Sequence, residues 1–199
     1  MSDGKPIKIS AVTASEVCAH FNLENSARRL LDDRMGPGEF VEALVVSKQY
    51  LAGIEFMAHA LPAREAIWWG CLCLQYACGN ELSASEKAAC KAAVRWVLQP
   101  IEGNRAAAKA PAEAAGPASP AGALAMAANQ TGGSLAPPNL PPLPPGPFAP
   151  ARALANAVKF ASFKGDPVRR ADRQRLFVEL GMGVAEGRFI VGLSRLRED

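Results

Sequence analysis

Apolar residues are densest between Pro62 and Gly79, in the stretch PAREAIWWGCLCLQYACG. From Ala66 to Gly79 this stretch carries no charge, and Gln75 is its one strongly polar side chain. Proline suits the first position of a helix, and glycine suits the position just after its end. A helix that is apolar on every side is buried on every side, and this one is shorter than the about 20 apolar residues that a bilayer span needs. The pattern therefore predicts a buried central helix over 62–79.

The preceding segment, from Gly38 to His59, repeats apolar residues at steps of three and four. Such steps place side chains along one face of a helix. The segment is therefore predicted to form one long amphipathic helix. Because the connection at Pro62 is short, this helix should pack antiparallel to the central one. The residues that set the pattern are Phe40, Leu44, Ser47, Leu51, Ile54, Ala58 and Leu61.

Further helices are marked by their starting signals. Thr13–Glu16 and Ser83–Glu86 are capping boxes, in which a hydroxyl and a carboxylate satisfy each other's backbone donors. Pro150 and the pair Asp166–Pro167 are good first residues of two later helices. Together these elements predict an all-α fold, a compact bundle of six to seven helices around the central helix 62–79, with an irregular proline-rich strap.

The domain organisation follows from where the composition changes. Residues 1–12 read as a polar N-terminal tail, and residues 13–100 as the N-terminal helical part. Residues 101–120 are rich in Ala and Pro and are predicted to be a linker. Residues 121–199 hold the proline-rich strap (Pro137–Pro150) and the C-terminal helices, which we expect to pack on the first part as one domain.

The composition of the chain limits the cellular locations and the classes of partner to be expected. The chain has 199 residues, 49% of them hydrophobic, and its formal net charge of +3 is too small to predict a nucleic-acid partner. Its five cysteines are an odd number, and three of them lie in the predicted central helix. Paired cysteines are therefore not expected, and a reducing, cytoplasmic location fits best. The N-terminus MSDGKPIKIS lacks an apolar segment, so no signal peptide and no membrane partner are predicted.

The sequence contains few residues in patterns typical of catalysis, cofactor binding or metal binding. Cys71 and Cys73 are two residues apart, so they point to nearly opposite sides of a helix and cannot both coordinate one metal ion. Neither a P-loop nor a dinucleotide fingerprint occurs, and His20 and His59 are the chain's only histidines. We therefore expect no catalytic residue, no cofactor and no metal site. The alternative is an enzyme of unknown reaction with a pocket near Trp68, Tyr76 and Cys78.

The proline-rich strap has the most specific binding signal. Its residues 138–141 and 141–144 are PxxP patterns, and Arg152 follows them. Such segments dock on aromatic grooves because they are already extended and lose little entropy on binding. The interpretation that the sequence favours is different: the strap covers the chain's own helices, with apolar residues as pegs. The pegs would be Leu135, Leu140, Leu143 and Phe148, and the candidate protein-binding residues are Pro141, Pro144, Pro147, Phe148 and Arg152.

Two groups of basic residues are further candidates. Arg169, Arg170 and Arg173 lie in the first half of the last predicted helix and form a second candidate protein-binding surface. Lys87, Lys91 and Arg95 recur at steps of four, which is typical of a solvated helix face. The alternative for both groups is weak nucleic-acid binding.

Two segments resemble a known family: LPAREAIWWGCLC (61–73) and GGSLAPPNLPPLPPGPFAPARALANAV (132–158). They look like an uncharacterised bacterial family, a domain of unknown function, over about residues 38–187. The resemblance implies an association with type VI secretion genes, and it favours a strap that is part of the fold. No catalytic or binding residue comes with it. The function expected from the sequence is a non-catalytic protein-binding module, an adaptor or chaperone-like accessory protein of a bacterial secretion system. A protein partner is expected, and a homo-oligomer is left open.

Overall fold

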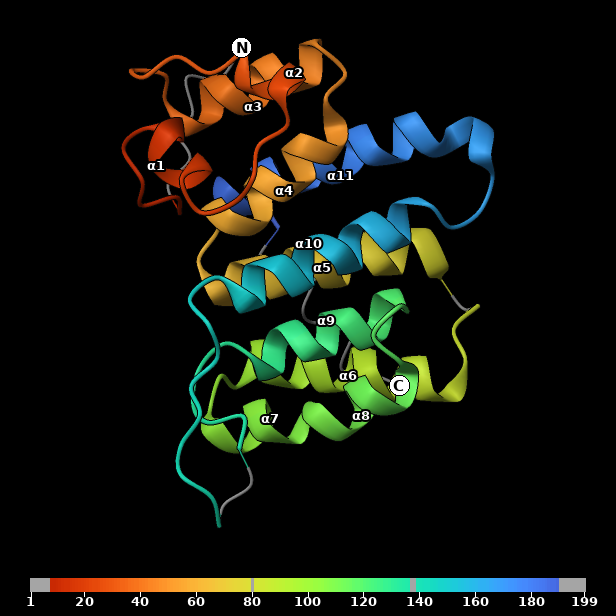
Figure 1. The fold of residues 1–199 in the computed structure, drawn as a ribbon. Helices are drawn as coiled ribbons and strands as arrows, with labels where there is room; N and C mark the ends of the chain where they lie inside the picture. Colours follow the sequence, from red (N-terminus) through yellow and green to blue (C-terminus); the bar gives the residue numbers. More distant parts are fainter. Residues whose placement is uncertain (1–7, 80, 137–138, 190–199) are drawn as a thin grey trace.

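The structure, a computed structural model, describes residues 8–79, 81–136 and 139–189. Every regular element in these residues is helical, so the chain is all-α as predicted (Figure 1). The elements are α1 (Ala14–Cys18), α2 (Asn25–Arg28), α3 (Pro37–Val46), α4 (Tyr50–Ala60), α5 (Ala63–Cys78), α6 (Ala84–Leu98), α7 (Glu102–Ala107), α8 (Lys109–Ala115), α9 (Pro120–Asn129), α10 (Ala149–Ser162), the 3-10 helix η1 (Pro167–Arg169) and α11 (Arg170–Ala185).

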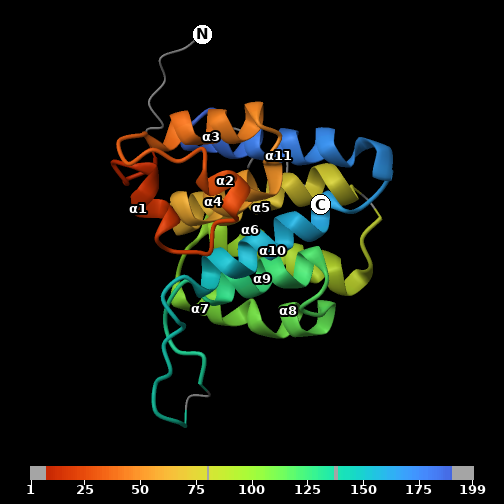
Figure 2. The same cartoon turned by 45° about the horizontal axis from the view of Figure 1, so that its top comes forward.

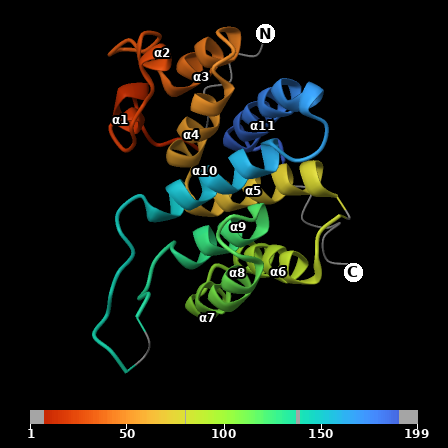
Figure 3. The same ribbon diagram turned by 45° about the vertical axis from the view of Figure 1, so that its right-hand side comes forward.

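The helices are arranged around α5 and α10, which lie side by side in the middle of the molecule (Figures 1 and 3). On one side of this pair α4 and α11 pack together with α3, and on the other side lie α9 and α6, followed by α8 and α7. Helix α5 contacts α6, α9, α10 and α11. The prediction of a central helix is therefore confirmed.

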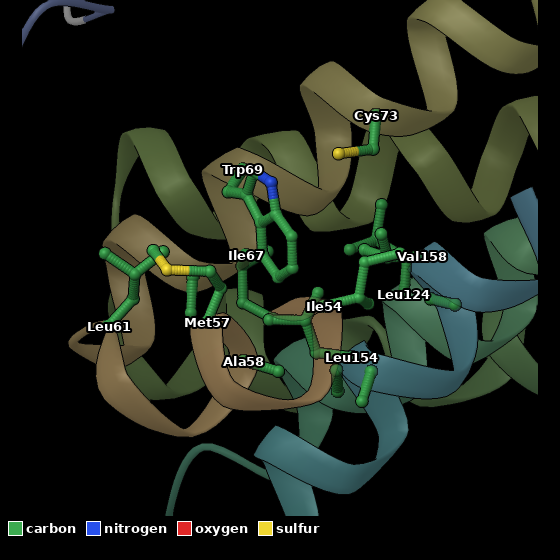
Figure 4. Close-up of a cluster of buried hydrophobic side chains, with 14 of the residues drawn as sticks. Ile54, Met57, Ala58, Leu61, Ile67, Trp69, Cys73, Leu124, Leu154 and Val158 are labelled. Atoms are coloured by element: carbon green, nitrogen blue, oxygen red, sulfur yellow. The ribbon is translucent and has the colours of Figure 1, made fainter. Parts of the chain in front are cut away.

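Helix α5 is buried along most of its length. Every residue from Ala66 to Cys71 is buried, although Tyr76 near the C-terminal end is 60% exposed. In Figure 4 the side chains of Ile67 and Trp69 lie among residues of α4, α9 and α10. The indole Nε1 of Trp69 donates a hydrogen bond of 2.8 Å to the carbonyl oxygen of Phe177 in α11, so this buried polar atom is satisfied.

The segment 38–59, predicted as one helix, forms two. Helix α3 ends because Lys48 adopts the left-handed conformation, with a φ of 57°. The amide of Gln49 then donates to the carbonyl oxygen of Leu44 at 2.8 Å, and the amide of Lys48 donates to that of Val45 at 3.1 Å. This pair of bonds is a Schellman motif. The prediction missed it because lysine replaces the glycine that normally marks such an end.

The segment 101–120, predicted as a linker, also holds helices. Helices α7 and α8 pack against α6 and α9, and Ala108 and Ala112 are buried in these contacts. Small side chains allow helix backbones to approach closely, so this alanine-rich segment forms helices that pack tightly on their neighbours. With the break at Lys48, these helices raise the number in the described residues above the six or seven expected.

The expected polar tail, residues 1–12, is described only from Lys8 onward. The amide of Lys8 donates to the carbonyl oxygen of Ala185 at 3.0 Å, and Ile9 is buried. The last residues of this tail therefore lie on the helical body. None of the helices in the described part of the chain combines the length and the apolar character that crossing a membrane requires.

We predict that Gly70→Val lowers the free energy of unfolding by about 1–3 kcal/mol, the usual cost of overpacking a core. A Cβ atom at Gly70 would lie 2.6 Å from a Cδ1 atom of Leu124 in α9 and 2.6 Å from one of Leu154 in α10. Urea unfolding measures the change. Gly103→Val is the matched control, because a Cβ at Gly103 has no neighbour within 4 Å. Equal stability of the two variants would contradict the packing described here.

Candidate functional site

The loop that joins α9 to α10, residues 130–148, carries most of the proline-rich strap. Figures 2 and 3 show this loop running away from the helical body and returning to it at α10. Its described residues contain neither helix nor strand. Within the loop the amide of Leu135 donates to the carbonyl oxygen of Leu143 at 2.8 Å, and the amide of Leu143 donates to Oγ of Ser134 at 3.0 Å. The two arms of the loop are thereby joined to each other.

The outer part of the loop does not cover the chain's own helices. Leu140 is 55% exposed and Leu143 is 59% exposed, and the surrounding residues Pro141 and Pro144 are exposed too. The interpretation that both leucines are pegs in the helical body is therefore wrong. Of the four expected pegs, Leu135 is half-buried and Phe148 contacts the body through its ring. The side chains of Leu140 and Leu143, whose apolar character suggested burial, are exposed to solvent instead.

The start of the loop is fixed by Arg105, a residue of α7. Its buried guanidinium donates to the carbonyl oxygens of Asn129 and Ser134 and forms two hydrogen bonds with the carboxylate of Glu102. Gly133, with a φ of 63°, passes so close that a Cβ there would lie 2.6 Å from an Nη atom of Arg105. The predicted linker thus supplies the anchor of the loop.

A cavity of about 390 Å³ lies where the loop returns to the body. Its walls come from the end of α4, the start of α5, the start of α10, and the loop itself. Several wall residues also belong to the apolar cluster in Figure 4, so the floor of the cavity is the hydrophobic core. These residues are Ala58, Leu61, Ile67 and Leu154.

Both histidines of the chain lie beside this cavity. The ring of His20 stacks on that of Phe148, with centroids 4.2 Å apart, and the ring of His59 stacks on Phe21 at 4.8 Å. His59 lines the cavity, and its side chain has no exposed surface. Nδ1 of its ring has no hydrogen-bond partner, whereas Nε2 lies 3.4 Å from Oε1 of Glu55. Buried polar atoms without partners are rare and need an explanation.

Glu55 joins His59 to α10. Its carboxylate forms an ion pair with Nζ of Lys159 and lies one helical turn before His59. Burial would raise the pKa of the Glu55 carboxyl, but the hydrogen bonds and positive charges of His59 and Lys159 outweigh burial and lower that pKa below its ordinary value. Glu55 is therefore ionised at neutral pH, and its charge is matched by Lys159.

The strap residues predicted from the sequence fall into two places. Pro147 and Phe148 line the cavity, whereas Pro141 and Pro144 lie on the exposed outer part of the loop. Arg152 is exposed in the first turn of α10. The structure thus brings the five candidates to one end of the molecule, but only two of them share the cavity.

The basic candidates lie at the other end of α10. This helix has 14 residues, so its ends are about 20 Å apart. Arg169 is exposed, and the guanidinium of Arg170 lies over the ring of Phe163 at 4.9 Å. Arg173 is buried and donates to the carbonyl oxygens of Ser162 at 3.0 Å and Asp166 at 3.3 Å. Arg173 therefore stabilises the turn after α10, and the binding role of Arg169 and Arg170 stays a prediction.

The thiols near the expected enzyme pocket are poor nucleophiles. Burial raises the pKa of Cys71, Cys73 and Cys78 above the ordinary value, and it raises that of Cys90 to about 12. A thiol reacts as its thiolate, so these groups are unreactive at neutral pH. The cavity also lies at the opposite end of α5 from Tyr76. All five cysteines are free, and no group of three or more potential metal ligands forms in the described part of the chain.

The row Lys87, Lys91 and Arg95 is exposed along α6, as the sequence indicated. It lies on the far side of α5 from α4 and α11, and none of its residues lines the cavity.

Comparison with protein families identifies the chain. A model of a family of unknown function, DUF6931, matches residues 40–185, and the chain therefore belongs to this family. The matched region runs from α3 to the end of α11 and includes the α9–α10 loop. Comparisons with curated proteins and with solved structures find no match.

We predict that Glu55→Gln lowers the free energy of unfolding by about 1–3 kcal/mol at pH 7, because it removes the charged partner of Lys159. The Glu55 carboxyl has a lower pKa in the folded state than the ordinary 4.5, so its ionised form stabilises the folded state at pH values above 4.5. This stabilisation is lost as the pH falls below 4.5 and the carboxyl becomes protonated. The difference between wild type and variant should therefore shrink below about pH 4.5.

Urea unfolding between pH 3 and 7 measures this difference. Glu179→Gln is the matched control, because Glu179 pairs with Arg175 on an exposed face and should change stability by less than about 0.5 kcal/mol. A difference for Glu55→Gln that is the same at pH 3 and pH 7 would contradict the assignment.

Proposed function

We propose that the protein is a non-catalytic binding module that presents the outer part of the α9–α10 loop, residues 139–144, to a protein partner. The observation that carries this proposal is the exposure of Leu140 and Leu143 between exposed prolines. Exposed leucines held in a proline-rich segment have no evident role in stabilising the fold. They have the composition of a ligand for an aromatic-lined groove.

The restricted conformation of the loop suits this role. Prolines restrict the backbone, so the segment loses little conformational entropy when it binds. The hydrogen bonds between the two arms and the anchor at Arg105 further limit the conformations of the free loop. A partner would therefore meet a segment that is largely preorganised, with two leucines as its apolar contacts.

The biological setting is part of the same proposal. The resemblance of residues 61–73 and 132–158 to a bacterial family associated with type VI secretion genes supports an adaptor or chaperone-like role in a bacterial secretion apparatus. Five free cysteines favour a reducing compartment, so we place this role in the cytoplasm.

The test is affinity capture with tagged full-length protein from its native host, followed by mass spectrometry. We expect one stoichiometric protein partner, and we expect the double variant Leu140→Ser/Leu143→Ser to lose most of it. The control is Ile101→Ser/Val168→Ser, which removes two apolar side chains that are 59% and 87% exposed outside the loop. The control should retain the partner.

Equal capture by the wild type and the loop variant would contradict the proposal. If the Arg169→Glu variant lost the partner instead, the interaction surface would be the turn after α10. A wild-type protein that captures no stoichiometric partner would overturn the function as a protein-binding module.

A further inference from the structure

Ser134 connects the two arms of the α9–α10 loop to the helical body. Its carbonyl oxygen accepts a hydrogen bond of 3.3 Å from Arg105, and its hydroxyl oxygen accepts from the amides of Ala136 at 3.1 Å and Leu143 at 3.0 Å. Arg105 is itself buried and exchanges hydrogen bonds with Asn129 at the end of α9. A single residue therefore links the body to the returning arm of the loop.

The sequence leaves few ways to hold the returning arm. Residues 141–145 are PPLPP, and proline has no backbone N–H, so Leu143 is the only backbone donor that this stretch offers. That donor is bonded to Ser134, and the carbonyl oxygen of Leu143 accepts from the amide of Leu135 at 2.8 Å. Both backbone groups of Leu143 are thus bonded within the loop, while its side chain is 59% exposed.

A loop closed in this way differs from a linear proline-rich ligand. The extended segments that bind aromatic grooves have no internal hydrogen bonds, and their backbone is solvated. Here the bond between Ser134 and Leu143 joins residues nine positions apart, so the entropic cost of bringing the arms together is already met in the free protein. A partner that contacts only the leucine side chains gains from this preorganisation. A partner that needs the extended backbone must first break the bonds to Leu143.

We propose that Ser134 is the positioning residue of the α9–α10 loop, and that the partner recognises the closed loop rather than an extended proline-rich segment. The partner's site is then apolar, takes the side chains of Leu140 and Leu143, and forms no hydrogen bond with the backbone of Leu143. This inference rests on the proposed function, because it concerns the partner of the same loop.

Amide hydrogen exchange of the full-length ¹⁵N-labelled protein, measured by NMR, tests the role of Ser134 without any partner. Ser134→Ala removes the acceptor of the Leu143 amide and keeps the bond from Leu135 to Leu143. We expect exchange at Leu135 to become about fivefold faster, because the loop opens more often once one of its cross-links is lost. Ser134→Thr keeps a hydroxyl and should restore the slow exchange. Thr131→Ala is the matched control, because its hydroxyl donates to Ala128 in α9.

The protein obtained by affinity capture is the probe for recognition. Its affinity should fall about fivefold for Ser134→Ala and return to the wild-type value for Ser134→Thr, with the midpoint of thermal unfolding unchanged in both variants. A synthetic linear peptide of residues 130–148 carries both leucines but lacks the anchor at Arg105. We therefore expect the peptide to bind at least about tenfold more weakly than the full-length protein.

Unchanged exchange at Leu135 in the Ser134→Ala variant would overturn the role of Ser134 and leave the proposed function standing. Faster exchange with unchanged affinity would overturn recognition of the closed loop, and so would a linear peptide that binds as tightly as the full-length protein. A wild-type protein that captures no partner would overturn the proposed function and recognition of the closed loop together. The exchange experiment separates these cases because it needs no partner.

Discussion

The fold depends on how closely helices can approach α5. Gly70 has no side chain, and the methyl groups of Leu124 and Leu154 occupy the space where a Cβ atom would be. Helix α9 meets α5 and α10 with small residues, since most of its buried positions are alanine or glycine. Because interiors pack as densely as crystals, this close approach fixes how α9 and α10 lie against α5. The loop that joins these two helices is held at its start by Arg105.

Local sequence signals predicted the parts of the fold that depend on local physics. The uncharged stretch 66–79 identified α5, and the capping box Ser83–Glu86 marked the start of α6, where Ser83 and Glu86 form the expected hydrogen bonds. The break at Lys48 was missed because a left-handed lysine carries no sequence signature. Helices α7 and α8 were missed because their stability comes from packing against α6 and α9, which composition alone does not reveal.

The candidate site was predictable only in part. Proline spacing identified the strap, but its exposed leucines resembled core residues, and only the structure shows that they leave the body. The polar groups around His59 come from separate elements: His20 follows α1, Glu55 lies in α4 with His59, and Lys159 lies in α10. Their one local signal is the four-residue spacing of Glu55 and His59. The anchor Arg105 lay within a segment predicted to be a linker, so nothing in the sequence pointed to its burial.

The central claim is that the outer part of the α9–α10 loop, with Leu140 and Leu143, stands free of the helical body. The most direct test is the free energy of unfolding of Leu140→Ser/Leu143→Ser, measured in urea on the isolated protein. Replacement of exposed side chains should change this free energy by less than about 0.5 kcal/mol. A loss of more than about 2 kcal/mol, the size expected when buried leucines are truncated, would show that the loop packs on its own helices and would contradict the account.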